Sequence, residues 1–115
     1  MTLKIYHTPR CSKSRQALQL LQEQGYAPEV IEYLKQPPSA EQLREIIKLL
    51  DITPRQLLRK QEDEFKAEGL DDPTVSDEGI IAAMIRSPKL IERPILVASG
   101  KAAIGRPPEA VLTIL

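Results

Sequence analysis

Residues 3–34 read LKIYHTPRCSKSRQALQLLQEQGYAPEVIEYL, and the order of elements within them sets the architecture. Apolar residues alternate over 3–6, as in a strand, and Pro9 then fixes a loop. Over 12–24 the apolar spacing becomes helical, until a glycine ends the helix. A second strand over 30–33 completes a strand–helix–strand unit, so its two strands should pair in parallel.

Residues 39–87 predict a helical insertion. Ser39 begins a helix with a capping box, because a glutamine follows three residues later. A threonine–proline pair predicts a short helix over 54–59, and Ser76 caps a further helix that ends before a proline. Residues 61–75 are polar and predict an irregular segment that has room for one helical turn. The first helix carries an apolar stripe at helical spacing, made of Leu43, Ile46, Ile47 and Leu50.

The last third of the chain returns to strands. Residues 95–98 are continuously apolar, as in a central strand buried on both faces. Ser99-Gly100 predicts a tight hairpin into a strand over 101–104, and 109–115 form a closing helix. The fold class is therefore α/β, a four-stranded mixed sheet with helices. This is the arrangement of the thioredoxin fold, predicted as a single domain over 1–115 with an insertion at about 39–87.

Composition narrows the function classes. The 115 residues carry 16 basic and 16 acidic side chains, which gives no electrostatic footprint for nucleic acid. No run of apolar residues is long enough to span a membrane, so we expect a cytoplasmic protein. One cysteine excludes an internal disulfide, and with a single histidine it cannot form a zinc site within one chain. We therefore expect no metal.

Cys11 is the candidate nucleophile. It lies between the first strand and the first helix, where unpaired N–H groups and the positive end of the helix dipole favour a thiolate. Arg15 should project from the first helical turn towards the same end. The alternative is that Cys11 is a small buried hydrophobe. Basic and hydroxyl-bearing residues are close to it in sequence: Arg10, Ser12, Lys13, Ser14 and Arg15.

Two further features bear on the thiol. A phosphatase loop would need an arginine six residues after the cysteine, but that position is Ala17, so this class of enzyme is disfavoured. His7, four residues before Cys11, either acts on the thiol, by lowering its pKa or relaying a proton, or hydrogen-bonds the loop.

Three arginines lie at element boundaries. Arg59 ends the short helix, Arg93 precedes a proline at the entry to the third strand, and Arg106 lies in a Gly-Arg-Pro-Pro break. In thioredoxin folds the peptide bond before this strand is commonly cis, which would aim Arg93 at Cys11. A tetrahedral oxyanion requires several converging guanidinium groups. Each arginine alone is most simply a solvated surface residue, and periodicity does not show that the three converge.

Five segments together resemble one family. Residues 7–15 resemble the active-site loop of the glutaredoxin-dependent arsenate reductases. The resemblance covers essentially the whole chain, in order, and continues through Tyr33-Leu34-Lys35-Gln36-Pro37-Pro38, Leu57-Leu58-Arg59-Lys60, Ile91-Glu92-Arg93-Pro94-Ile95 and Gly105-Arg106-Pro107-Pro108-Glu109.

The resemblance implies roles for these residues. Cys11 would be the catalytic nucleophile, and the oxyanion would be bound by Arg59, Arg93 and Arg106. His7 and Arg15 would have supporting roles, and we count the hydroxyl donor Ser14 with them. The substrate would be arsenate, the product arsenite, and the reductants glutathione and glutaredoxin, with no bound metal or organic cofactor.

Two other functions stay open at this point. The first is a glutathione-linked thiol oxidoreductase with a different substrate. The second is a polymerase-binding module similar to the Spx-type regulators, which belong to the same fold family and use a CxxC switch. Ser14 occupies the second cysteine position of that motif, so a two-cysteine switch is impossible, although binding is not excluded.

Overall fold

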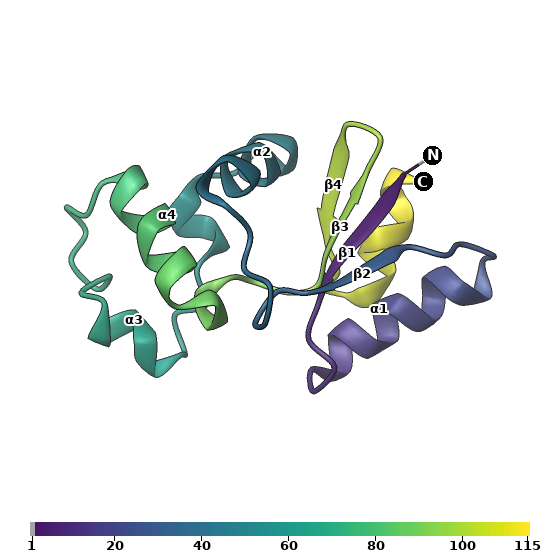
Figure 1. Ribbon diagram of the computed structural model, residues 1–115, viewed down its shortest axis with the longest axis horizontal. Helices are drawn as coiled ribbons and strands as arrows, with labels where there is room; N and C mark the ends of the chain where they lie inside the picture. The colour runs from purple at the N-terminus through teal and green to yellow at the C-terminus, as the bar shows by residue number, and fades with distance from the viewer. Residues whose placement is uncertain (1) are drawn as a thin grey trace. The chain divides into compact units, whose positions relative to one another are not determined.

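The computed structural model describes residues 2–115, which divide into two compact units (Figure 1). One comprises Met1–Gln36 with Arg93–Leu115, and the other comprises Pro37–Glu92. We call them the sheet unit and the helical unit. The helical unit contains the predicted insertion, with bounds a few residues wider than expected at each end.

The sheet unit contains all four strands. They are β1 (Leu3–His7), β2 (Glu29–Glu32), β3 (Ile95–Ala98) and β4 (Lys101–Ile104), arranged in the order β2-β1-β3-β4. β1 pairs with β2 in parallel and with β3 in antiparallel, and β3 pairs with β4 in antiparallel. The predicted mixed sheet of the thioredoxin-like fold is therefore confirmed.

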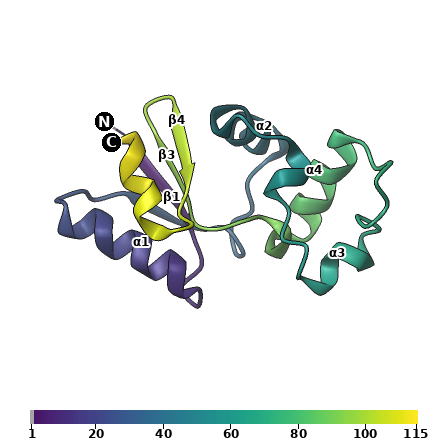
Figure 2. The ribbon, with the colours of Figure 1, turned by 180° about the vertical axis from the view of Figure 1, so that it is seen from behind.

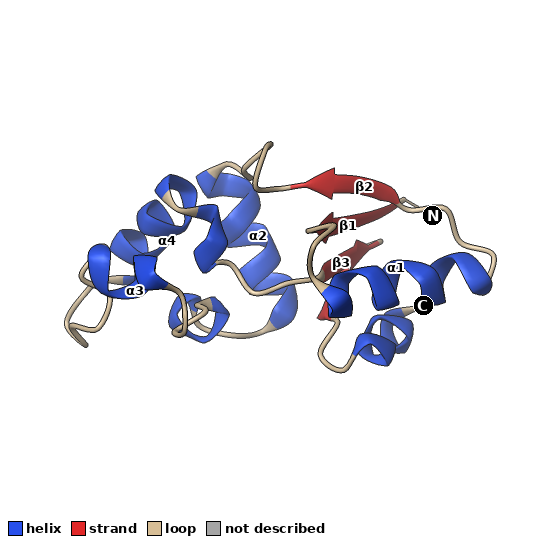
Figure 3. Ribbon diagram, turned by 90° about the horizontal axis from the view of Figure 1, so that it is seen from below, coloured by secondary structure: helices blue, strands red, loops and turns tan. Residues whose placement is uncertain are grey.

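Two helices pack on one side of this sheet. α1 (Ser12–Glu23) and the C-terminal 3-10 helix η3 (Pro108–Ile114) lie side by side against the strands (Figures 2 and 3). At the far end of β3, Ser99 and Gly100 both have positive φ, of 41° and 81°, which makes the predicted hairpin turn. The core between strands and helices is formed by Leu3, Ile5, Ala17, Leu21, Leu96, Ala98 and Val111.

The helical unit contains three α-helices and two 3-10 turns. They are α2 (Ala40–Leu50), η1 (Pro54–Leu57), α3 (Asp63–Ala67), α4 (Asp77–Arg86) and η2 (Pro88–Leu90). α2 begins with the predicted capping box, since Ser39 Oγ accepts the Gln42 N–H at 3.1 Å and Gln42 Oε1 accepts the Ser39 N–H at 2.9 Å. η1 ends two residues earlier than predicted, and α3 is the single short helix within the polar segment.

Across residues 2–115, no helix is long and apolar enough to cross a membrane. Among the same residues, no cluster of three or more histidine, cysteine, aspartate and glutamate side chains could hold a metal ion.

Candidate active site

Cys11 lies at the head of α1. It is the N-cap residue, with an extended backbone at φ −87° and ψ 121°, and it is partly exposed. A tight turn leads into it, because the Cys11 N–H donates to the Thr8 carbonyl at 3.1 Å. The Cys11 carbonyl then accepts the first bond of the helix, from the Arg15 N–H at 3.0 Å. The thiol is thus fixed at the end of the helix where unpaired N–H groups converge.

A buried hydrogen-bond network holds this turn in place. Ser14 is fully buried, and its Oγ accepts the Thr8 N–H at 3.1 Å. The same Oγ is 2.8 Å from Nδ1 of His7, which is also buried. Burial lowers the pKa of His7; Glu32 raises it to a smaller extent, and the charge of Arg15 adds to the lowering. His7 is therefore neutral at pH 7, and it is placed to bond the loop.

Arg93 reaches the thiol from the start of β3. The Arg93-Pro94 peptide bond is cis, and the Arg93 guanidinium donates a hydrogen bond to the Cys11 sulfur. It also bonds the phenol of Tyr33, a side chain with no exposed surface. Arg93 thus lies between the Cys11 sulfur and a buried tyrosine that fixes its position.

Arg106 reaches the same sulfur from the break after β4. Its Nη2 lies 3.7 Å from Cys11 Sγ, and its Nε donates to the Arg93 carbonyl at 2.8 Å. Gly105, the residue before Arg106, packs against Pro94, and its N–H donates to the Pro94 carbonyl at 2.8 Å. A Cβ at Gly105 would lie 2.7 Å from Pro94 Cγ, so a larger residue would clash with this proline.

The surroundings of Cys11 favour its thiolate. Burial raises the pKa of the thiol, but four other groups together outweigh burial, so the net shift is downward. In decreasing order these are the Ser14 N–H, the Arg93 guanidinium, the Lys13 N–H and the charge of Arg106. The helix N-terminus and the two arginines therefore act together on one sulfur.

Arg59 lies in the helical unit and is paired with carboxylates. Its Nη1 is 2.8 Å from Glu92 Oε1, and its Nε is 3.8 Å from Glu62 Oε2. Its backbone N–H donates to the Leu90 carbonyl at 2.8 Å, which anchors the segment after η1. The structure brings Arg93 and Arg106 to Cys11, whereas a meeting of Arg59 with that pair stays a prediction.

Arg15 supports the loop that precedes the thiol. Its Nη1 donates to the Pro9 carbonyl at 2.8 Å, and the side chain is exposed.

Residue patterns did not single out two partners in this site, Tyr33 and Glu92. Tyr33 follows an edge strand, a position at which a tyrosine does not indicate any particular contact. Only its burial shows that its hydroxyl needs a hydrogen-bond partner.

Comparison with known proteins agrees with this fold. The ArsC family matches residues 6–114. The chain is 54% identical to the uncharacterised protein YfgD of Escherichia coli K12, over 98% of this chain and 96% of that one. It is 45% identical to an arsenate reductase of Neisseria meningitidis serogroup A, over 98% and 97% of the two chains.

Among solved structures, an arsenate reductase from Vibrio cholerae superposes with a TM-score of 0.96 and 49% identity. The alignment covers 100% of this chain and 98% of that one. Because the family match extends over nearly all residues and the relatives are matched over nearly their full lengths, the chain belongs to the ArsC family.

Proposed function

We propose that this protein reduces arsenate to arsenite, with the Cys11 thiolate as nucleophile and with glutathione and then glutaredoxin as external reductants. The observation that carries the proposal is that two guanidinium groups, from Arg93 and Arg106, face a sulfur at a helix N-terminus. Relatives named arsenate reductases, at 45% identity and less, support the choice of oxyanion.

The first step forms a bond between sulfur and arsenic. The Cys11 thiolate attacks arsenic and displaces one oxygen as hydroxide, which leaves as water after taking a proton. Arg93 and Arg106 donate to the remaining negatively charged oxygens and stabilise the charge that develops in the transition state. Arg59 completes the oxyanion site in this proposal.

The second step transfers two electrons to arsenic. A glutathione thiolate attacks the Cys11 sulfur and forms a disulfide, while the sulfur–arsenic bond breaks and its electron pair stays on arsenic. Arsenic leaves as arsenite. A glutaredoxin thiol then attacks the mixed disulfide and restores Cys11. Since the electrons come from thiols, no bound metal or organic cofactor enters the proposal, and a glutathione-rich cytoplasm supplies the reductant.

A coupled assay tests this function. Purified protein with glutathione, glutaredoxin, glutathione reductase and NADPH should oxidise NADPH only when arsenate is added, and arsenite should accumulate in equal amount. Cys11→Ser should abolish both signals, while Ser12→Ala, a neighbouring change on the exposed side of α1, should not. A fully reduced protein that exchanges disulfides but does not turn over arsenate would reject the proposal in favour of a thiol oxidoreductase.

A further inference from the structure

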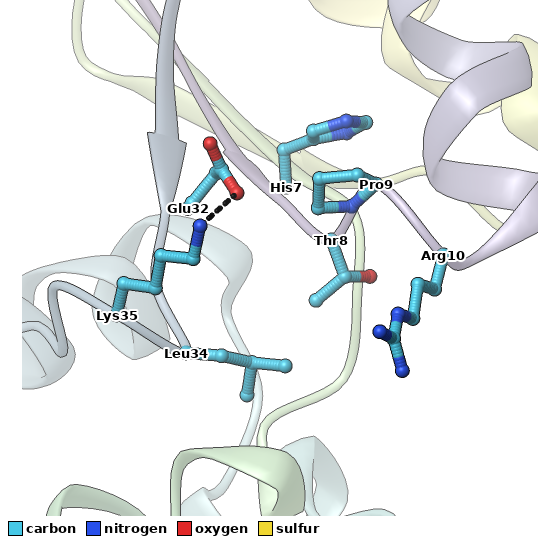
Figure 4. Close-up of a pocket in the computed structure, with 7 residues that line it drawn as sticks. All are labelled: His7, Thr8, Pro9, Arg10, Glu32, Leu34 and Lys35. Atoms are coloured by element: carbon cyan, nitrogen blue, oxygen red, sulfur yellow. Dashed lines mark ion pairs between the residues drawn. The ribbon is translucent and has the colours of Figure 1, made fainter.

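A pocket of about 410 Å³ opens in the sheet unit beside the loop that leads into Cys11 (Figure 4). Its walls come from two segments, the end of β1 with its loop and the end of β2 with its turn. These are the carboxyl ends of parallel neighbours, where side chains from successive loops meet. The volume falls within the range of small-molecule sites. The lining residues are His7, Thr8, Pro9, Arg10, Glu32, Leu34 and Lys35.

This pocket is separate from the oxyanion site. Neither Arg93 nor Arg106 lines it, so the guanidinium groups that face the Cys11 sulfur are not among its walls. Pro9 and Arg10 do line it, and they are the two residues immediately before Cys11. A ligand in the pocket would therefore lie along the chain segment that presents the thiol.

The lining combines an apolar surface with three charges. Leu34 is 42% exposed, so part of its apolar side chain is open to a ligand. Arg10 and Lys35 project from different walls of the pocket, and Glu32 lies beside Lys35 (Figure 4).

These charges are available to a ligand. The Lys35–Glu32 pair is 3.6 Å apart, with side chains 80% and 43% exposed, so solvent screens it and it contributes little to stability. Arg10 is exposed, and no side chain among residues 2–115 forms an ion pair with it. The pocket thus offers two cations and one anion around an apolar wall.

We propose that this pocket binds glutathione, a thiol peptide with two carboxylates and one amino group, as the second substrate. This inference rests on the proposed function, in which an external thiolate must attack the Cys11 sulfur because the chain has one cysteine. The two carboxylates would pair with Arg10 and Lys35, and the ammonium with Glu32. Held there, the peptide directs its thiol towards Cys11, forms the sulfur–sulfur bond and leaves the arsenic electron pair on arsenite.

S-methylglutathione tests the site without chemistry, because its blocked thiol cannot donate electrons. In a titration followed by amide NMR, saturable shifts should concentrate in residues 7–10 and 32–35. Lys35→Glu should weaken binding by roughly three- to tenfold, since it replaces an attractive charge with a repulsive one. Lys101→Glu, an equal charge reversal on β4 of the same unit, should leave the affinity unchanged. In both variants Cys11 should be alkylated at the same rate as in the wild type.

The two proposals fail in distinguishable ways. If S-methylglutathione binds here but arsenate is never turned over, the proposed function is wrong and the binding site stands. If arsenate is reduced but S-methylglutathione shifts amide signals outside residues 7–10 and 32–35, the pocket proposal is overturned. It is also overturned if the two charge reversals raise the KM for glutathione equally, or if these amides respond only to glutaredoxin protein.

Discussion

The Nε of Arg106 donates to the backbone carbonyl of Arg93 at 2.8 Å, so the two arginines that face the thiol are joined to each other. The same Arg106 side chain places its Nη2 3.7 Å from Cys11 Sγ. Arg93 donates to that sulfur from the other chain segment. The backbone of Arg93 therefore places the Arg106 side chain, and both guanidinium groups contact the same sulfur.

Replacing either arginine should damage catalysis strongly. Arg93→Ala and Arg106→Ala should each lower kcat/KM for arsenate by about 100- to 1000-fold, the effect expected for loss of one donor to a developing oxyanion. Because both guanidinium groups contact the same sulfur and would bind the same oxyanion, the double variant should lose less than the product of the single losses. Steady-state kinetics measures all three.

The control for this prediction is Arg44→Ala. Arg44 is exposed on α2 and pairs with Glu78 at 2.7 Å, so its loss should leave kcat/KM near the wild-type value. Losses at Arg93 and Arg106 no larger than at Arg44 would show that the guanidinium groups at the sulfur do not bind the substrate.

Tyr33→Phe should weaken the placement of Arg93. The change removes only a hydroxyl that bonds the Arg93 guanidinium, and it leaves the buried ring in place. We expect kcat/KM for arsenate to fall by roughly three- to tenfold, equivalent to about one hydrogen bond. Tyr26→Phe, which removes a hydroxyl from a partly buried tyrosine after α1, serves as control. Equal kinetics for the two variants would remove Tyr33 from the site.

Ser14→Ala should cost stability. Its buried hydroxyl accepts the Thr8 N–H and bonds His7, so alanine would leave two buried polar groups without this partner. The free energy of unfolding should fall by about 1–3 kcal/mol. Ser12 is exposed on the first turn of the same helix, and Ser12→Ala should change the value by less than about 0.5 kcal/mol. Urea denaturation measures both, and an unchanged Ser14→Ala midpoint would argue against the network.

His7 should make the protein less stable in mild acid. Its pKa is lowered from 6.5 in the folded state, mainly by burial, so the unfolded chain takes up a proton first as the pH falls. The contribution of neutral His7 to the free energy of unfolding is fully present above pH 6.5. It is lost as the pH falls from 6.5 towards the folded pKa. NMR titration of this single histidine gives the folded pKa directly.

The stability effect of His7 has its own test. Urea denaturation at successive pH values should show a decline just below pH 6.5 in the wild type. His7→Gln should lack that part of the decline, because glutamine does not titrate. A folded pKa at or above 6.5 would contradict the buried, neutral state of His7.

Much of the fold was predictable because its signals are local. The capping residues Ser39 and Thr53 each bond the glutamine three positions later, as their spacing indicates. The turn at Ser99-Gly100 likewise depends on residues next to each other. The thioredoxin-like arrangement follows from these elements in order, since a parallel pair joined by a helix leaves few topologies.

The site was less predictable because its contacts are between residues distant in sequence. Ser14 could be counted as a hydroxyl donor near the thiol, yet its hydroxyl bonds His7 and Thr8 while its backbone N–H acts on the sulfur. Glu92 pairs with Arg59 across 33 positions, and no periodicity connects them.

The ionisation of Cys11 with and without sulfate tests the central claim most directly. The thiolate absorbance, corrected with Cys11→Ser, should titrate below the ordinary thiol value of 9.0. Sulfate, an unreactive tetrahedral anion, should raise this midpoint in the wild type, because it places negative charge at Arg93 and Arg106 beside the sulfur. It should have little effect in the variant lacking both arginines. An ordinary midpoint that sulfate does not move would contradict an activated thiolate beside an oxyanion site.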